Sequence, residues 1–263
     1  DEGATWTSAQ PLLDPTSVPD DLGRVAPDLV GRRPAIRVPS LGHGVQLATG
    51  PQRGRMMIVG NATYEAQSVF DSVLHSYWSD DAGRTWTFGP TPNRLDDGRP
   101  ARGLNETSIA ATANGEVVLS IRAYCDEIAL PERTLARAGP VGASGWRWHR
   151  IRSGTGLTAP PVQGSIAAHP SPASGVEVVA CHPSHPRERR GLTLHALDAD
   201  GNVTAKRTLR SGYSGYSDLA AHPSTGAWTV LFESAPNGEI SVLATDPWPF
   251  ATSPTRADEQ TAP

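Results

Sequence analysis

The sequence has few cysteines, no long apolar run and no excess of basic charge. Its 263 residues include only Cys125 and Cys181, which allow one disulfide but exclude a disulfide-rich scaffold and a four-cysteine zinc site. No apolar stretch approaches the ~20 residues that a membrane-spanning helix needs. The formal net charge of −4 gives no basic field for nucleic acid. These absences argue against nucleic-acid-binding and transmembrane classes.

Helical periodicity is also scarce, and the best 3.6-residue pattern, over 126–138, is interrupted by Pro131. The 26 glycines and 24 prolines are scattered between short apolar runs, which indicates a turn-rich all-β fold. Turn dipeptides at Asn114-Gly115, Asp200-Gly201 and Asn237-Gly238 predict hairpins. The predicted strands are 55–59, 72–78, 107–111, 116–121, 165–168, 176–180, 192–197, 228–232 and 239–244.

One short motif occurs twice. Residues 79–86 fit S-x-D-x-G-x-T-W, and residues 1–6 fit its last six positions, with weaker echoes at 144–146 and 198–204. A repeat of roughly 40 to 60 residues with several strands is typical of a propeller blade. The aspartate can accept backbone N–H bonds across a turn, the glycine permits positive φ, and the tryptophan buries a large ring. We therefore interpret the motif as structural and not catalytic.

The repeat resembles the Asp-box that several propeller families share, and further segments resemble the sialidase (neuraminidase) family. In chain order these segments are 42–47 (G-x-G-I-Q), 104–108 (N-E-x-x), 115–122 (D-G, an apolar run, then R), 189–194 (R-x-N-L-T) and 211–219 (G-Y-S-x-L). The resemblance implies a six-bladed β-propeller of sialidase type over residues 1–250, with partial first blades, followed by a polar C-terminal tail at 251–263.

The same resemblance implies the site residues. Tyr216 takes the position of the nucleophile and Glu106 that of its general base, while Arg122 and Arg189 take positions that bind the substrate carboxylate. Guanidinium groups suit this task because they grip carboxylates in a bidentate manner. A neutral phenol avoids repulsion by the substrate carboxylate, but its pKa near 10 requires an adjacent base. Arg190 replaces Arg189 if the register slips by one residue.

A second Gly-Tyr-Ser sequence contains Tyr213, but only Tyr216 is followed by Ser-Asp-Leu. The two neighbouring histidines His182 and His185 each precede a proline, which favours turns over a metal site. We expect no metal and no organic cofactor.

The implied activity is that of an exo-α-sialidase, a glycoside hydrolase. It would release terminal α-linked sialic acid from glycoproteins, glycolipids or oligosaccharides with retention, through a tyrosyl-enzyme intermediate. Family habit implies a secreted or cell-surface location. The alternative is a non-catalytic Asp-box propeller that binds a glycan or a protein, which would need the arginines but not the tyrosine–glutamate pair.

Two family elements are not matched in the expected order. Sialidases have an R-I-P segment with a first arginine, and then an aspartate acid/base, before the first Asp-box, whereas here an Asp-box begins at residue 1. We therefore expect a propeller that is incomplete at its N-terminus, which argues against turnover by these 263 residues alone. In the alternative placement, residues 36–39 imitate R-I-P, and Arg37 and Asp71 supply the missing groups.

Overall fold

The computed structural model shows an all-β fold. It describes residues 5, 8, 11–65, 68, 71–91, 102–123, 132–141, 145–148, 152, 155–170 and 175–248. Within these ranges the helices are short, namely α1 (Leu22–Val25) and the 3-10 helix η1 (Pro27–Leu29). None of the described helices is long and apolar enough to cross a membrane. The repeat at 1–6, Cys125 and the tail at 251–263 lie outside the described residues.

The strands form four antiparallel sheets. The first contains β1 (Pro34–Pro39), β2 (Val45–Gln46), β3 (Met56–Tyr64), β4 (Val73–Ser79) and β5 (Thr87–Phe88). The second contains β6 (Leu104–Ala111), β7 (Val117–Ala123), β8 (Thr134–Val141) and β9 (Gly145–Trp148). The third contains β10 (Ser165–Ala168), β11 (Val178–Pro183), β12 (Arg190–Leu197) and β13 (Val203–Tyr213). The fourth contains β14 (Ser217–Ala221), β15 (Trp228–Glu233) and β16 (Ile240–Ala244).

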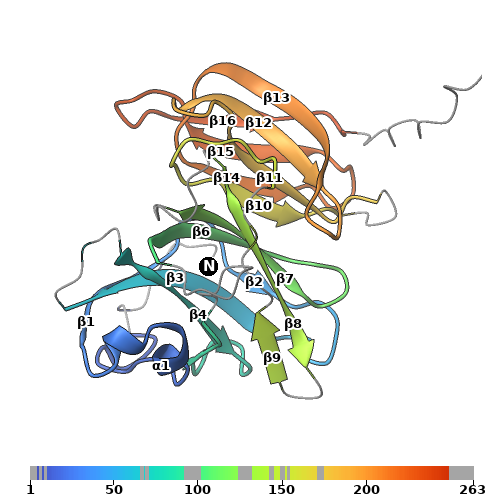
Figure 1. The fold of residues 1–263 in the computed structure, drawn as a ribbon. Coiled ribbons are helices and arrows are strands. Elements are labelled where there is room, and N and C mark those ends of the chain that lie inside the picture. The colour runs from blue at the N-terminus through green and yellow to red at the C-terminus, as the bar shows by residue number, and fades with distance from the viewer. Residues whose placement is uncertain are drawn as a thin grey trace, which may run out of the picture.

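The sheets follow one another as four blades of a propeller (Figure 1). Each of the last three sheets is a meander in chain order, and β1 and β2 both pair with β3 in the first. Neighbouring sheets meet through β3, β6, β10 and β14, because β6 contacts β3 and β10, and β10 contacts β14. The last three of these are the first strands of their sheets. The sequence analysis expected six blades, whereas the described residues form four.

The cores lie between neighbouring sheets, which explains why the strands read as short apolar runs. In β7, Val117 and Leu119 pack toward the first sheet, while Val118 packs toward the third. In β11, Val178 packs toward the second sheet and Val179 toward the fourth. A strand that is buried on both faces has no polar alternation, so its signal is a continuous apolar run.

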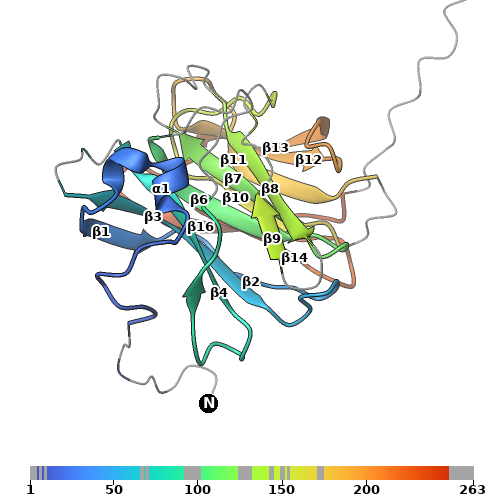
Figure 2. The ribbon, with the colours of Figure 1, turned by 60° about the horizontal axis from the view of Figure 1, so that its bottom comes forward.

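The two end sheets each have one face without a neighbouring blade. On the first sheet, α1 and η1 cover part of this face, where Leu22 and Leu29 pack with Tyr64 (Figure 2). On the last sheet, Val242 stands opposite Leu231, and their side chains are 62% and 46% exposed.

The predicted hairpin turns are confirmed. Asn114-Gly115 joins β6 to β7, Asp200-Gly201 joins β12 to β13, and Asn237-Gly238 joins β15 to β16. Their glycines have φ angles of +84°, +78° and +82°. This left-handed region is open to glycine at little cost, so these dipeptides close tight turns.

The motif at 79–86 forms the turn between β4 and β5. Asp81 accepts hydrogen bonds from the Ser79 hydroxyl (2.8 Å) and from both the backbone N–H (2.8 Å) and the hydroxyl (2.7 Å) of Thr85. These bonds favour the carboxylate and hold the pKa of Asp81 at about 2. The echo at 198–204 has the same spacing, because Asp198 accepts the N–H of Asn202 at 2.8 Å. These aspartates therefore organise turns.

Candidate active site

Glu106 and Arg122 come from neighbouring strands of the second sheet. The register of β6 and β7 shifts between Leu104 and Thr107, so Glu106 lies in an irregular stretch of β6 near the end of β7. Arg122 Nη1 donates a hydrogen bond to Glu106 Oε2. The two side chains are only 10% and 18% exposed. The result is a largely buried ion pair at one edge of the sheet.

Tyr216 lies directly before β14 and reaches this ion pair from the fourth sheet. Its hydroxyl donates to Glu106 Oε1 at 2.5 Å and accepts from Arg122 Nη1 at 3.1 Å. Three side chains separated by up to 110 residues of sequence thus form one hydrogen-bonded cluster, which we call the Tyr216 cluster. The sequence analysis expected Tyr216 and Glu106 to lie within hydrogen-bond reach, and the structure brings them together.

The electrostatics of the Tyr216 cluster keep the phenol protonated. Burial raises the pKa of Tyr216, and the hydrogen bond to Glu106 and the charge of that carboxylate raise it further, whereas Arg122 lowers it. The phenol therefore carries its proton at neutral pH. Glu106 is positioned to accept that proton, and Arg122 is positioned to stabilise negative charge on the oxygen.

The backbone of Tyr216 is fixed by Glu233 at the end of β15. Tyr216 N–H donates to Glu233 Oε2 at 3.1 Å, and Glu233 N–H donates to Tyr216 O at 2.9 Å. Gly215 is required beside it, since a Cβ at this position would lie 2.0 Å from Glu233 Oε2. On the other side, Gln163 Oε1 accepts the N–H of Ser217 at 2.9 Å. These contacts hold the tyrosine in place from two sheets.

Arg189 lies in the loop before β12 and faces the Tyr216 ring. Its guanidinium carbon is 5.4 Å from the ring centroid, and its carbonyl accepts the N–H of Ser214 at 2.9 Å. Arg190 instead pairs with Glu188 at 2.8 Å, with both side chains more than half exposed. The sequence left the choice between Arg189 and Arg190 open, and in the structure it is Arg189 that lies next to Tyr216. Tyr213 lies at the end of β13, opposite Arg190.

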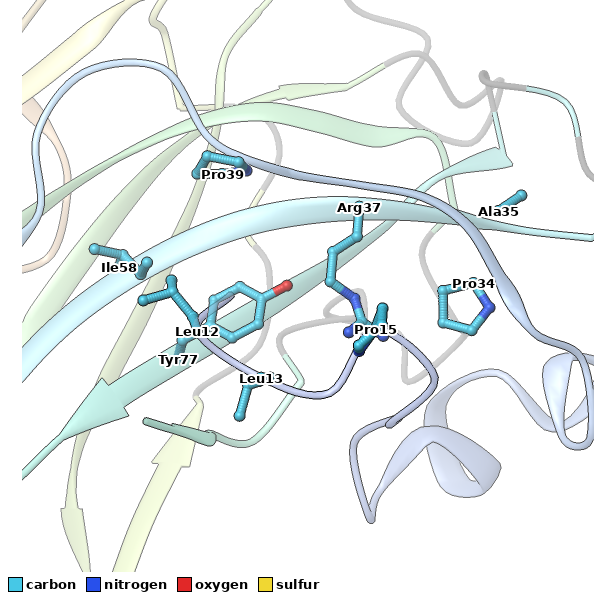
Figure 3. Close-up of a pocket in the computed structure, with 9 residues that line it drawn as sticks. All are labelled: Leu12, Leu13, Pro15, Pro34, Ala35, Arg37, Pro39, Ile58 and Tyr77. Atoms are coloured by element: carbon cyan, nitrogen blue, oxygen red, sulfur yellow. The ribbon is translucent and has the colours of Figure 1, made fainter. Parts of the chain in front are cut away.

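Of the alternative residues Arg37 and Asp71, the partners of Arg37 lie on the first sheet and in the segment before it. Arg37 donates to the carbonyl of Ser17 and lies 5.1 Å from the Phe88 ring centroid. It lines a cavity of about 360 Å³ on the first sheet, under residues 12–15 (Figure 3). Among the described residues, none of these partners belongs to the Tyr216 cluster. Asp71 is exposed just before β4. The contacts of Arg37 therefore do not support its half of the alternative placement, and Asp71 stays a prediction.

The two neighbouring histidines have other partners. His182 stacks on His195 with ring centroids 4.4 Å apart, and its Nδ1 donates to the carbonyl of Pro183 at 2.9 Å. His185 Nδ1 accepts the N–H of Glu188 at 2.9 Å. The expectation of a turn is wrong for His182, which lies in β11. Within the described ranges, no group of three or more metal-ligating side chains is present.

Sequence reasoning missed Glu233 and Gln163. Each acts on a backbone N–H, and such a contact depends on the register between distant segments and leaves no motif. The only usable signal was a charged residue, Glu233, that ends the apolar alternation of β15.

No protein-family model matches the sequence. Solved structures do resemble the fold. An intramolecular trans-sialidase from Ruminococcus gnavus matches with a TM-score of 0.63 and 18% identity, over 91% of this chain and 46% of its own. A leech intramolecular trans-sialidase matches with a TM-score of 0.61 and 17% identity, over 81% of this chain and 32% of its own. A sialidase from Streptococcus pneumoniae matches with a TM-score of 0.56 and 16% identity, over 78% of this chain and 29% of its own.

The chain spans less than half the length of each of these proteins. The matches cover 78–91% of this chain at 16–18% identity, a level of likeness that shows the fold alone. The chain therefore has the β-propeller fold of the sialidases and trans-sialidases.

Proposed function

We propose that this chain carries the nucleophilic half of a sialidase site and acts on terminal α-linked sialic acid, as an exo-α-sialidase that retains anomeric configuration. The observation that carries the proposal is the hydrogen bond of 2.5 Å between the Tyr216 hydroxyl and Glu106. A phenol that is half-buried, protonated and bonded to a carboxylate is a nucleophile with its base in place. A binding module has no use for such a pair.

The proposed reaction begins with attack by the Tyr216 oxygen on the anomeric carbon of the sialoside. Glu106 takes the phenolic proton as the new C–O bond forms, and the aglycone oxygen leaves with the electron pair of the glycosidic bond. Water then attacks the anomeric carbon of the glycosyl-tyrosine and releases one proton to the solvent, while the bond from that carbon to the Tyr216 oxygen breaks and Glu106 returns its proton to that oxygen. Two displacements at one carbon give net retention.

Arg122 and Arg189 are proposed to hold the carboxylate of the sugar. Both guanidinium groups lie beside Tyr216. A carboxylate placed between them would sit next to the anomeric carbon that Tyr216 attacks. This arrangement would favour sialosides over neutral sugars. The proposed substrates are therefore sialylated glycoproteins, glycolipids and oligosaccharides. A secreted or cell-surface location is part of the same proposal and rests on the habit of the family.

The departing aglycone also needs a proton when it is an alcohol. An aryl sialoside avoids this need, because a phenolate leaves without strong assistance from an acid. An aryl substrate therefore tests the Tyr216 half of the site by itself.

The test is release of a fluorogenic phenol from an aryl α-sialoside by the wild-type chain and by Tyr216→Phe, Glu106→Gln and Tyr213→Phe. The proposal predicts turnover that falls by at least about 10³-fold in the first variant and about 10²-fold in the second. Tyr213→Phe is the matched control, because it changes the neighbouring Gly-Tyr-Ser sequence outside the Tyr216 cluster, and it should keep wild-type turnover.

The alternative function, a propeller that binds a glycan or a protein, makes a different prediction. The wild-type chain would bind sialosides through the arginines, but it would release no phenol. Equal turnover by wild type and Tyr216→Phe would also contradict the proposal, because the tyrosine would then take no part in the chemistry.

A further inference from the structure

Arg133, which directly precedes β8, is a buried cation without an acidic partner. Its side chain belongs to the largest fully buried groups of the protein, with 2% exposure. Its three bonded donors reach neutral acceptors: Nε donates to Ser120 Oγ at 2.6 Å, Nη2 to Ser120 O at 3.0 Å and Nη1 to Val162 O at 2.6 Å. In the described part of the chain, no carboxylate lies within ion-pair distance of it. Buried charges are normally paired, so this arrangement needs an explanation.

The backbone around Arg133 has been adapted to it. A Cβ on Gly164 would lie 3.3 Å from the guanidinium carbon and 2.7 Å from His182 Cβ. Glycine at position 164 therefore allows the backbone to lie this close to both side chains. The arginine N–H also donates to Leu157 O at 2.9 Å, and its carbonyl accepts from Thr155 Oγ1 at 2.9 Å. The guanidinium is therefore held in one place.

The acceptors of Arg133 connect it to the Tyr216 cluster by two short paths. Ser120 is two residues before Arg122 on β7. Val162 precedes Gln163, whose side chain holds the N–H of Ser217, the residue after Tyr216. Arg133 is also electrostatically coupled to the cluster. Burial lowers its pKa most, Arg122 lowers it as well and Glu106 raises it, and together these effects leave the pKa at about 9. At neutral pH it is charged.

The charges around the tyrosine then add to a positive total. Two carboxylates are present, because Glu106 pairs with Arg122 and Glu233 accepts the N–H of Tyr216. Against these stand three arginines, namely Arg122, Arg189 and Arg133, so the charges of these described residues leave one positive charge in excess. A monoanionic ligand would supply the missing negative charge. In a largely desolvated site, a fixed charge acts over a longer range than it does in water.

We propose that Arg133 is a positioning residue of the site, whose buried positive charge strengthens the binding of an anionic sugar without touching it. The inference rests on the proposed function, because the anion is the carboxylate of a sialoside. Its action is exerted through the field at Arg122 and through the fixed positions of Ser120 and Val162. A purely structural arginine would tie β7 to residue 162 but would not distinguish a charged ligand from a neutral one.

The experiment compares two ligands that differ in one charge. They are the 2,3-unsaturated analogue of sialic acid and its carboxyl methyl ester, with each Kd measured by ligand-observed NMR at pH 6. The quantity of interest is the ratio of the two Kd values. Arg133→Met should weaken the acid about ten-fold more than the ester, which is the order of magnitude expected when one unit charge is removed from a site with an effective dielectric constant of about 20.

Two further variants separate charge from packing. Arg133→Lys keeps the charge, and its three ammonium donors can meet the three acceptors, so the ratio should stay within about two-fold of wild type. Arg55→Met is the matched control, because Arg55 is 7% exposed and bonded to Asp80 at 2.7 and 2.8 Å, away from the Tyr216 cluster. It should lower stability and leave the ratio unchanged. Arg133→Gln provides a second neutral variant if Arg133→Met does not fold by circular dichroism.

A selective loss of acid binding in the neutral variants, retained in Arg133→Lys, supports the inference. An equal loss for acid and ester, or the same selective loss in Arg133→Lys, overturns it, because packing or geometry would then account for the effect. If the wild-type chain binds neither ligand, the proposed function fails and the inference fails with it. That failure can be distinguished from a failure of the inference alone, because it appears with the wild-type chain before any variant is measured.

Discussion

Replacement of Gly215 by alanine tests whether the contact with Glu233 holds the backbone of Tyr216 in place. Gly215 has no positive φ, so its backbone suits alanine and the penalty is steric alone. The new Cβ would lie 2.0 Å from Glu233 Oε2, 3.0 Å from Glu233 Cβ and 3.1 Å from Glu233 Cδ. Ordinary carbon–oxygen contact is more than 1 Å longer than the first of these distances, so the Glu233 carboxylate or the Tyr216 backbone must move.

The magnitude follows from two contributions. Overpacking of this kind costs about 1–3 kcal/mol, and loss of the hydrogen bond from Tyr216 N–H to the Glu233 carboxylate adds about 1–3 kcal/mol. We therefore expect the free energy of unfolding to fall by about 2–6 kcal/mol. A shift of about 1 Å in Tyr216 should also reduce turnover of an aryl sialoside about 10²-fold.

The assay is urea denaturation followed by fluorescence, together with the aryl sialoside rate. In the double variant Gly215→Ala/Glu233→Ala the obstructing carboxylate is gone, so the two changes should destabilise less than the sum of the single changes. A free energy of unfolding for Gly215→Ala within about 0.5 kcal/mol of wild type, with unchanged turnover, would refute the reasoning.

Three further predictions concern titratable groups. The pKa of Asp81 is depressed in the folded state, so its contribution to stability is present above pH 3.8 and is lost as the pH falls toward 2. In Asp81→Asn the melting temperature should therefore change less between pH 5 and pH 2 than it does in the wild-type chain. The pKa of His43 is raised chiefly by its 2.9 Å hydrogen bond with Asp218, so its contribution is present below pH 6.5 and is lost at higher pH; an NMR titration should show a normal or lowered His43 pKa in Asp218→Asn. Burial raises the pKa of the Cys181 thiol, so in a Cys125→Ser background Cys181 should react with a disulfide reagent only after unfolding.

Much of the fold could be predicted because its signals are local. The strand at 165–168 was predicted with the bounds of β10, since this segment is buried between two sheets and is bordered by turn residues. Strands β8 and β13 were missed for opposite reasons. The sequence leading into β8 has a helical pattern broken by Pro131, while β13 alternates exposed and half-buried residues, with Lys206 among the exposed ones. An edge strand of this kind is polar along one face and lacks the apolar run that was used for the inner strands.

The site was predictable only through the resemblance of short segments to a family. No property of Tyr216 or Glu106 alone indicates that two residues 110 positions apart share a hydrogen bond. The contacts of Glu233, Gln163 and Arg133 are further from prediction, because each depends on how one sheet packs on the next. Arg133 is the clearest case, because arginines usually lie at the surface of a protein, whereas Arg133 is buried in the structure.

The most direct test of the central claim is covalent trapping of Tyr216. A sialyl fluoride with a second fluorine at C3 slows both displacements but keeps the good leaving group, so the glycosyl-enzyme accumulates. The account predicts one sialyl adduct by intact mass, assigned to Tyr216 and not Tyr213 by tandem mass spectrometry, and absent in Tyr216→Phe. An adduct on another residue, or no adduct on a chain that binds the unsaturated analogue, would contradict it.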